Sequence, residues 1–355
     1  MILRVDNLTK YYGDLLAVDD VSFGIEEGDF VTLLGPSGCG KSTILHTIAG
    51  FLEPTEGSVY LRGENVTDRP PNKRNIGMSF QNTALFPHMS VRENISYGLR
   101  MRNYDARSNE QRVDKILELI DLPEHGEHKP SELSGGQQQR VSLGRSIAFE
   151  PDILLLDEPL TGLDRVLREE MRFWLKQIQD ETDVTMLYVT HDQADALSMS
   201  DKVIVLRDGK KQQEANPKTI YERPANSFVA EFVGKSTSFE GQVKQNGDIV
   251  EIETSDSKIA VDYDRYRSFG GQNETDPVTA YVRPEDVRIS TNGRVDGPNA
   301  FNGTVEEILD MGDRSEVTVA VDELGTVLVY TERFPEFDEG DEVDVEIPDT
   351  KVMLP

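Results

Sequence analysis

Two patterns of hydrophobic and polar positions divide the chain. Up to about residue 235, short runs of consecutive apolar residues alternate with longer stretches in which apolar positions recur at helical spacing. Continuous apolar strands are typical of a sheet buried on both faces, so this pattern predicts a mostly parallel sheet covered by helices. It predicts strands at 29–34, 152–156, 185–190 and 202–207, and helices at 41–51, 167–180 and 193–199.

One stretch of this first part is almost entirely helical in pattern. Between residues 87 and 149 the apolar spacing predicts helices at 91–101, 109–122 and 134–148. A run of helices inside an alternating strand–helix series indicates an insertion, and we expect it to span about residues 88–150. At the N-terminus, residues 1–5 alternate like a strand and do not resemble a signal peptide.

Beyond residue 235 the pattern changes to short alternating runs about every ten residues. Gly, Asn and Asp separate these runs, which is typical of a small antiparallel barrel or sandwich. The runs predict strands at 240–243, 249–254, 278–282, 287–290, 303–309, 316–321, 327–330 and 342–347. We therefore predict two domains, 1–235 and 236–355.

Composition narrows the class of protein. The 355 residues carry 37 Lys and Arg against 65 Asp and Glu, a net charge of −28, and the last 120 residues hold 10 basic and 28 acidic side chains. Such acidity opposes non-specific binding to nucleic acid. It reflects either solvated faces or a halophilic adaptation to high internal salt. A single cysteine, Cys39, excludes an internal disulfide and fits a reducing interior, and no apolar run approaches bilayer-spanning length.

A glycine-rich segment follows the strand predicted at 29–34. Glycines let successive backbone N–H groups point at phosphate oxygens, and the helix N-terminus adds positive potential. We expect Lys41 to contact the β- and γ-phosphates and Ser42 to ligate Mg²⁺. The residues that fit the phosphate-loop pattern G-x-x-x-x-G-K-[ST] are Gly35, Pro36, Ser37, Gly38, Cys39, Gly40, Lys41 and Ser42, and Thr43 is assigned to the same nucleotide site.

Two carboxylates end the strand predicted at 152–156. Asp157 suits a role beside Ser42 in holding Mg²⁺, and Glu158 suits the role of orienting and polarising the attacking water. Strands often end in acidic residues. The assignment therefore depends on the phosphate loop elsewhere in the same predicted sheet.

A Ser-Gly-Gly sequence precedes the helix predicted at 134–148. Ser134, Gly135 and Gly136 would present backbone N–H groups at a helix start, where an anion is favoured. A plain helix cap has the same pattern, so the spacing by itself leaves both interpretations open.

The stretch Leu133-Ser134-Gly135-Gly136-Gln137 resembles the signature sequence of ATP-binding cassette (ABC) ATPases, and it lies upstream of the Asp157 strand as in that family. The resemblance covers residues 1 to about 235 and implies binding of ATP and Mg²⁺. It also implies roles for four further residues: Tyr12 would stack on adenine, Gln81 would sense the γ-phosphate side and ligate Mg²⁺, Asp164 would lie in the D-loop, and His191 would be the switch histidine.

The same resemblance implies a head-to-tail homodimer with two ATP molecules. Ser134, Gly135, Gly136 and Gln137 of one subunit would cover the γ-phosphate held by the other. Two positions depart from the usual family pattern, Ser79 before the Gln81 segment and Gly162 in the D-loop. Neither touches the phosphates, although Gly162 bears on communication across the dimer.

The C-terminal 120 residues resemble the regulatory β-domain of importer-type ABC ATPases, most closely at 281–287, and segments 84–95 and 220–234 resemble the same subfamily. The implied fold is an α/β P-loop NTPase cassette with a helical insertion, followed by a small all-β, barrel-like (OB-type) domain. The implied function is ATP hydrolysis that powers uptake of a small solute. The subfamily that these segments resemble serves ferric iron, polyamines, sulfate and sugars, and of these we favour ferric iron or a polyamine. Permease subunits, and indirectly an extracytoplasmic solute-binding protein, would be the partners at the cytoplasmic face of the membrane.

Two other classes of function are weighed against the importer. Soluble ABC ATPases act on DNA or on ribosomes; the first kind carries long coiled coils inside the cassette and the second usually carries two cassettes, and this chain has neither. The C-terminal barrel could instead read oligonucleotides, but its acidity opposes that. We therefore expect no nucleic-acid partner.

Overall fold

The computed structural model describes residues 1–80, 83–102, 105–246, 249–268, 277–291 and 297–355. The chain forms two compact units, Met1–Pro217 and Lys218–Pro355, so the division comes earlier than the predicted boundary at 235. The reason lies in Arg283 of the second unit, whose side chain is 1% exposed. Its Nη1 donates to the carbonyls of Ala230 and Gly234 at 2.8 and 2.7 Å, which ties the segment before 235 to the second unit.

A six-stranded sheet is the centre of the first unit, and all but one of its strand pairs are parallel, as the sequence pattern predicts. Successive residues of its strands face opposite layers: Leu155 packs in one core, and Leu154 and Leu156 pack in the other. In spatial order the strands are β10 (Lys210–Ala215), β9 (Lys202–Arg207), β3 (Phe30–Leu34), β8 (Met186–Thr190), β7 (Ile153–Asp157) and β6 (Ile76–Ser79).

A second sheet, antiparallel, lies on the other side of α1 (Lys41–Ala49) in the first unit, and the sequence pattern predicts only its first residues. Register shifts interrupt the pairing of β1 with β2 at three places, so the period-two alternation that signals a strand is broken. Its strands in spatial order are β2 (Leu15–Ile25), β1 (Leu3–Tyr12), β4 (Glu56–Leu61) and β5 (Glu64–Asn65).

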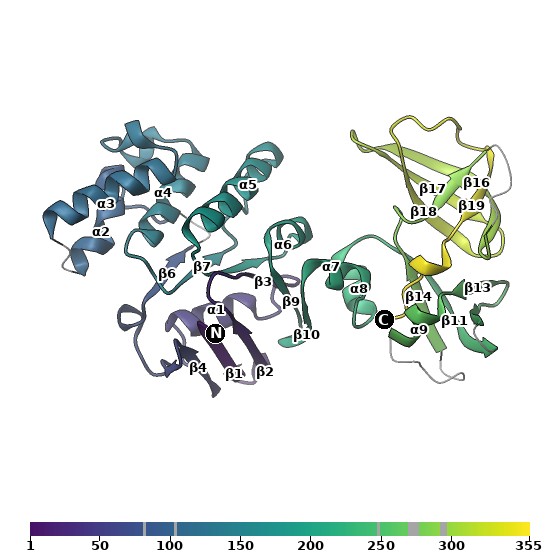
Figure 1. Cartoon of the computed structure of the whole chain (residues 1–355), viewed down its shortest axis with the longest axis horizontal. Helices are drawn as coiled ribbons and strands as arrows, with labels where there is room; N and C mark the ends of the chain where they lie inside the picture. The colour runs from purple at the N-terminus through teal and green to yellow at the C-terminus, as the bar shows by residue number, and fades with distance from the viewer. Residues whose placement is uncertain (81–82, 103–104, 247–248, 269–276, 292–296) are drawn as a thin grey trace. The chain divides into compact units, whose positions relative to one another are not determined.

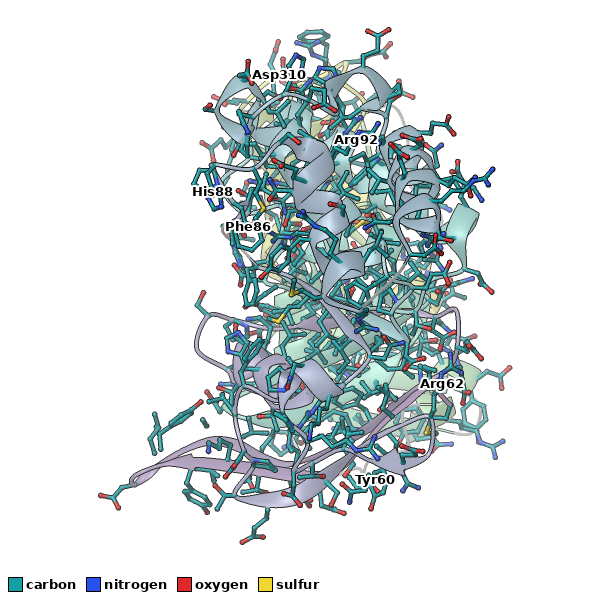
Figure 2. All side chains as sticks on the ribbon, turned by 90° about the vertical axis from the view of Figure 1, so that its left-hand side faces the viewer. Tyr60, Arg62, Phe86, His88, Arg92 and Asp310 are labelled. Carbon is teal, nitrogen blue, oxygen red and sulfur yellow. The ribbon has the colours of Figure 1, made fainter. Side chains whose placement is uncertain are left out.

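The predicted helical insertion consists of α2 (Val91–Met101), α3 (Ala106–Leu119) and α4 (Gly135–Ile147), with short 3₁₀ turns at Pro123–His125 and Pro130–Glu132. Another 3₁₀ turn, Pro71–Lys73, precedes β6, outside the insertion. Helices α2, α3 and α4 gather at one side of the first unit, away from β1, β2 and β4 (Figure 1). A capping box starts α2, because Ser90 and Glu93 each bond the other's backbone N–H. Phe86 and His88 lie together before this start (Figure 2), with ring centres 6.2 Å apart.

Two further helices complete the α/β layer. The long helix α5 (Arg165–Thr182) buries Met171, Trp174 and Leu175 in the core that also contains the insertion, and α6 (Gln193–Met199) follows β8. No helix in the described part of the chain has the length and apolarity needed to cross a membrane.

The second unit begins within α7 (Pro217–Glu222), includes α8 (Ser227–Val233) and continues as two antiparallel sheets around one core (Figure 1). These sheets confirm the predicted small all-β domain. Valines alternate inward along β17, whose odd-numbered residues 315–321 are all buried. The first sheet orders β13 (Lys258–Val261), β12 (Ile249–Glu253), β11 (Thr237–Asn246) and β14 (Pro277–Val282), with α9 (Tyr263–Ser268) after β13. The second orders β15 (Arg288–Ser290), β19 (Glu342–Glu346), β16 (Ala300–Asp310), β17 (Ser315–Val321) and β18 (Gly325–Thr331), and a 3₁₀ turn at Asp349–Lys351 follows.

Candidate functional site

The phosphate loop connects the end of β3 to the start of α1. Gly40 is the N-cap of α1 at φ +100°, and a Cβ there would lie 2.5 Å from the carbonyl oxygen of Ala17, so only glycine fits. Gly38 also has a positive φ, +81°. Together they fold the loop back over the helix N-terminus, where the first-turn N–H groups have no partner within the helix.

Lys41 is held inside this loop. Its side chain is 5% exposed, and Nζ donates to the carbonyl oxygens of Gly35 and Pro36 at 2.7 and 2.9 Å. No carboxylate of the described residues lies within ion-pair distance of Nζ. Its remaining hydrogen-bond partner among the described residues is the Cys39 sulfur, at 3.9 Å. A buried cation without a paired carboxylate is favoured to bind an anion, because burial of an unpaired charge is costly.

An open cavity of about 310 Å³ adjoins the loop. It brings Tyr12, at the end of β1, to the same space as the loop and Glu158. Tyr12 is 44% exposed, and the Nζ of Lys10 lies 5.4 Å from its ring centre. The predicted site residues that line the cavity are Tyr12, Ser37, Gly38, Gly40, Lys41, Ser42, Thr43 and Glu158, whereas Cys39 is buried behind the loop.

Asp157, the last residue of β7, faces α1. Its Oδ1 accepts a hydrogen bond from the Ser42 hydroxyl at 3.2 Å, and its Oδ2 lies 3.6 Å from Nε2 of His46. Burial raises the pKa of the Asp157 carboxyl, against the lowering effects of His46 and Ser42. A hydroxyl and a poorly hydrated carboxylate are oxygen donors of the kind that Mg²⁺ prefers, so the pair fits this ion.

Glu158 is fixed at both carboxylate oxygens. Oε1 lies 3.2 Å from Nδ1 of His191, and Oε2 accepts from the Thr161 hydroxyl at 3.1 Å. Its φ of +44° is rare for a residue with a Cβ. The backbone is held in that conformation by the bond from Glu158 N to the carbonyl of Val189, at 3.0 Å. Strain of this kind concentrates at functional sites.

The predicted signature segment starts α4. Ser134 is the N-cap, and a capping box joins it to Gln137: the Ser134 N–H donates to Oε1 at 2.9 Å, and the Gln137 N–H donates to the Ser134 hydroxyl at 3.3 Å. Fewer backbone N–H groups are therefore available to an anion than the sequence predicts, because the Ser134 N–H already donates to Gln137. Gly135 and Gly136 keep first-turn N–H groups without intrahelical partners, and a Cβ on Gly135 would meet no atom within 4 Å.

The other predicted site residues have mixed outcomes. Gln81 lies outside the described residues. Asp164 is the N-cap of α5, with Oδ1 accepting from the N–H of Leu167 at 3.0 Å. None of the four signature residues, 134–137, lines the cavity beside the phosphate loop within this chain.

Two contacts of the site were not predicted from the sequence. His46 lies one helical turn after Ser42, so a helix starting at 41 places both on one face, and this spacing could have identified it. Thr161 contacts Glu158 through a turn in which the N–H of Thr161 donates to the carbonyl of Glu158 at 3.2 Å. The sequence carries no clear signal for that turn.

Comparison with known proteins identifies two families along the chain. The ABC transporter family matches residues 18–161, and the TOBE domain matches residues 280–354. The Fe(3+) ions import ATP-binding protein FbpC of Fusobacterium nucleatum is 43% identical over 300 residues, which cover 84% of this chain and 78% of the relative. The spermidine/putrescine import ATP-binding protein PotA of Rubrobacter xylanophilus is 42% identical over 331 residues, covering 92% of this chain and 86% of the relative.

Solved structures resemble the cassette. A dimeric bacterial ABC transporter cassette matches with a TM-score of 0.54 and 34% identity, covering 61% of this chain and 99% of its own. The cbiO1 subunit of Clostridium perfringens, part of the ABC transporter complex cbiONQ, matches with a TM-score of 0.58 and 29% identity, covering 62% and 90%. These comparisons give no support to the nucleic-acid or ribosome alternative. The chain belongs to the ABC transporter family, as an importer-type ATPase subunit with a C-terminal TOBE domain.

Proposed function

We propose that two copies of this chain bind two ATP molecules between them and hydrolyse them with Glu158 as general base, to drive uptake of ferric iron or a polyamine through separate permease subunits. The single observation that carries the catalytic part is the anchoring of Glu158. Its two carboxylate oxygens contact His191 and Thr161, and the side chain lines the same cavity as the phosphate loop.

The chemistry assigned to the site is in-line attack of water on the γ-phosphate. Glu158 accepts the proton of that water, and Lys41 offsets the negative charge on the phosphate oxygens. Ser42 and Asp157, with Gln81, would hold Mg²⁺, which supplies further charge neutralisation on the phosphates when bound. His191 turns Nδ1 toward Glu158, and to donate from Nε2 to a phosphate oxygen at the same time the ring would have to carry a proton on both nitrogens, as an imidazolium.

The dimer is supported by the absence of the signature residues 134–137 from the nucleotide cavity within one chain. Its cavity has the phosphate loop, Tyr12 and Glu158 but none of residues 134–137. Gly135 and Gly136 lie in the first turn of α4, where N–H groups have no intrahelical partner, and the space beside Gly135 is open, so a phosphate on a second copy would satisfy these donors. We assign Asp164 to the same interface, as the residue that fixes the start of α5 beside the 160–164 segment.

The solute is inferred from the relatives. FbpC imports Fe(3+) ions and PotA imports spermidine and putrescine, as their names state, and both match this chain at similar identity. A permease in the membrane and an extracytoplasmic solute-binding protein would complete the importer, and the chain would sit on the cytoplasmic face. Specificity would lie in those partners, because the described site of this chain binds nucleotide.

An uptake assay tests the proposal. A strain lacking this chain is given labelled ferric citrate, spermidine, putrescine, sulfate or maltose, and uptake is compared after complementation with the wild-type chain or with Glu158→Gln. Recovery of ferric iron or polyamine uptake by the wild type alone is expected. Recovery only of sulfate or maltose uptake would contradict the solute assignment, and equal recovery by the variant would contradict the role of Glu158.

A further inference from the structure

Arg168 bridges two segments that flank the hydrolytic site. It lies in the first helical turns of α5, where Nη2 donates to the carbonyl oxygen of Leu163 at 3.0 Å. Nη1 donates to Oδ2 of Asp192 at 3.3 Å, and Asp192 directly follows His191. One planar guanidinium therefore holds the 160–164 segment at a fixed distance from the His191 segment.

These bonds complete a closed circuit around the catalytic carboxylate. Glu158 contacts Thr161 at one oxygen and His191 at the other. Thr161 belongs to the 160–164 segment, whose Leu163 carbonyl accepts from Arg168. His191 is the residue before Asp192, whose carboxylate also accepts from Arg168. A displacement of either segment must therefore be accommodated by the other, or break a hydrogen bond to Glu158.

The far end of the circuit is rigid. Asp192 is the N-cap of α6, where Oδ1 accepts from the N–H groups of Ala194 and Asp195 at 2.8 and 3.1 Å. Its own N–H donates to the Thr190 hydroxyl at 2.9 Å. Arg172, one turn further along α5, lies 3.3 Å from the same Oδ1. Oδ1 of Asp192 thus serves as the helix cap, and Oδ2 makes a separate bond to Arg168. This second bond links Asp192 to the 160–164 segment through Arg168.

Placing the Arg168 guanidinium between Leu163 and Asp192 leaves one of its donors without a partner. Nε of Arg168 is buried and has no hydrogen-bond partner among the described residues. An unmet buried donor lowers the stability of the folded state. By contrast, Arg165 at the same helix start is exposed, and its Nε donates to Oε1 of Glu169 at 3.1 Å.

We propose that Arg168 is a positioning residue of the hydrolytic site, through which the conformation of the 160–164 segment sets the position of His191 and hence of Glu158. The proposal rests on the proposed function, because it takes Glu158 as the base. In the dimer, contact of the partner copy with the 160–164 segment would then be felt at the switch histidine of the same chain.

The test compares Arg168→Gln with Arg165→Gln, which removes an equal charge from the same helix start without touching the circuit. ATP affinity, kcat and KM of the purified full chain are measured for both. We expect Arg168→Gln to lower kcat about ten-fold with its ATP dissociation constant changed less than about two-fold, and Arg165→Gln to alter neither. Equal kcat in the two variants would overturn the proposal, as would a loss of affinity as large as the loss of kcat.

Two further measurements separate positioning from a merely structural role. Millimolar methylguanidinium should restore part of the kcat of Arg168→Ala, and should leave that of Arg165→Ala unchanged. Arg168→Gln combined with Asp192→Asn should lose no more than the larger single effect, because both remove one bridge. No rescue together with additive losses would contradict the proposal. If Arg168→Gln does not fold, Arg168→Lys, which keeps the charge but cannot bridge both acceptors, takes its place in the same comparison.

Failure of the inference is distinguishable from failure of the proposed function. Glu158→Gln is assayed beside these variants. If it hydrolyses ATP at the wild-type rate, the proposed function fails whatever Arg168 does. If it is inactive while Arg168→Gln matches the wild type, only the bridge is wrong.

Discussion

Glu158 and His191 face one another across the ends of two neighbouring parallel strands, with Oε1 of the carboxylate 3.2 Å from Nδ1 of the imidazole. Because β7 and β8 are paired in register from Leu154 and Met186 onward, the residues that follow each strand emerge side by side at the same edge of the sheet. The catalytic assignment of Glu158 depends on this relationship, since a carboxylate held in a fixed orientation has a defined direction for accepting a proton.

The second anchor of Glu158 gives a sharp prediction. Thr161→Val removes the hydroxyl that donates to Oε2 and keeps the shape of the side chain, so we expect kcat to fall about ten-fold, the equivalent of one net hydrogen bond to a charged group. Thr161→Ser keeps the hydroxyl and should retain most of the activity. Steady-state ATPase assays of the two variants make the comparison, and equal rates would show that the contact does not position Glu158.

Lys41 should be needed for binding itself. Lys41→Ala removes the buried cation whose only partners in the described residues are carbonyls and the Cys39 sulfur. At about 100 times its dissociation constant a ligand raises stability by about 2.7 kcal/mol. Wild type should therefore melt at a higher temperature with Mg-ATP, measured by differential scanning fluorimetry, and the variant should not. The same shift in both proteins would place Lys41 away from the nucleotide.

Ser134 tests the shared site. Ser134→Arg puts a bulky side chain where the partner's γ-phosphate must dock and leaves the phosphate loop of the same chain intact. Nucleotide should still bind, while turnover and ATP-driven dimerisation fail. The matched control is Ser134→Ala, which removes the helix cap at a cost of about 1 kcal/mol without adding bulk. If Ser134→Arg and Ser134→Ala hydrolyse ATP equally well, the cross-dimer site is wrong.

The acidity of the second unit predicts a response to salt. Between residues 336 and 346 seven carboxylates crowd together, and Glu346 with Arg288 is the one ion pair recorded for them in the described residues. The screening length falls from about 10 Å at 0.1 M salt to about 3 Å at 1 M, so KCl should relieve their repulsion.

The single tryptophan lets this be measured in the full chain. Trp174 lies on α5 in the first unit, so its fluorescence follows that unit, while circular dichroism follows both. The transition without a tryptophan signal then reports on the second unit. If the acidity is a halophilic adaptation, the melting temperature of the second unit should rise more steeply with KCl than that of the first. If neither melting temperature changes with KCl, the carboxylates are better explained as ordinary solvated surface charges.

Much of the first unit could be predicted because its strands are buried on both faces. A continuous apolar run such as 30–34 gives a clear signal, and β3 and β7–β9 lie where the pattern placed them. The antiparallel sheet was missed because bulges break its alternation. The sequence likewise could not show that residues 218–235 join the second unit, since the reason is a buried Arg283 far along the chain.

For the site, local motifs were predictable and tertiary contacts were not. The phosphate loop is one contiguous segment whose glycines have a direct geometric purpose, as Gly40 shows. Contacts such as Thr161 with Glu158 and Arg168 with Leu163 depend on how the chain turns after β7, which residue spacing does not determine. The capping box of Ser134 follows from the S-x-x-Q spacing and could have been predicted.

The most direct test of the account is the behaviour of Glu158→Gln with ATP. The amide keeps the size of the side chain but cannot accept the proton, so hydrolysis should fall by about 10²–10⁴-fold while ATP still binds. Size-exclusion chromatography with light scattering should then show a stable dimer in Mg-ATP and a monomer in Mg-ADP, each dimer retaining two unhydrolysed nucleotides. A variant that stays monomeric in ATP and turns over at the wild-type rate would contradict both the base and the shared site.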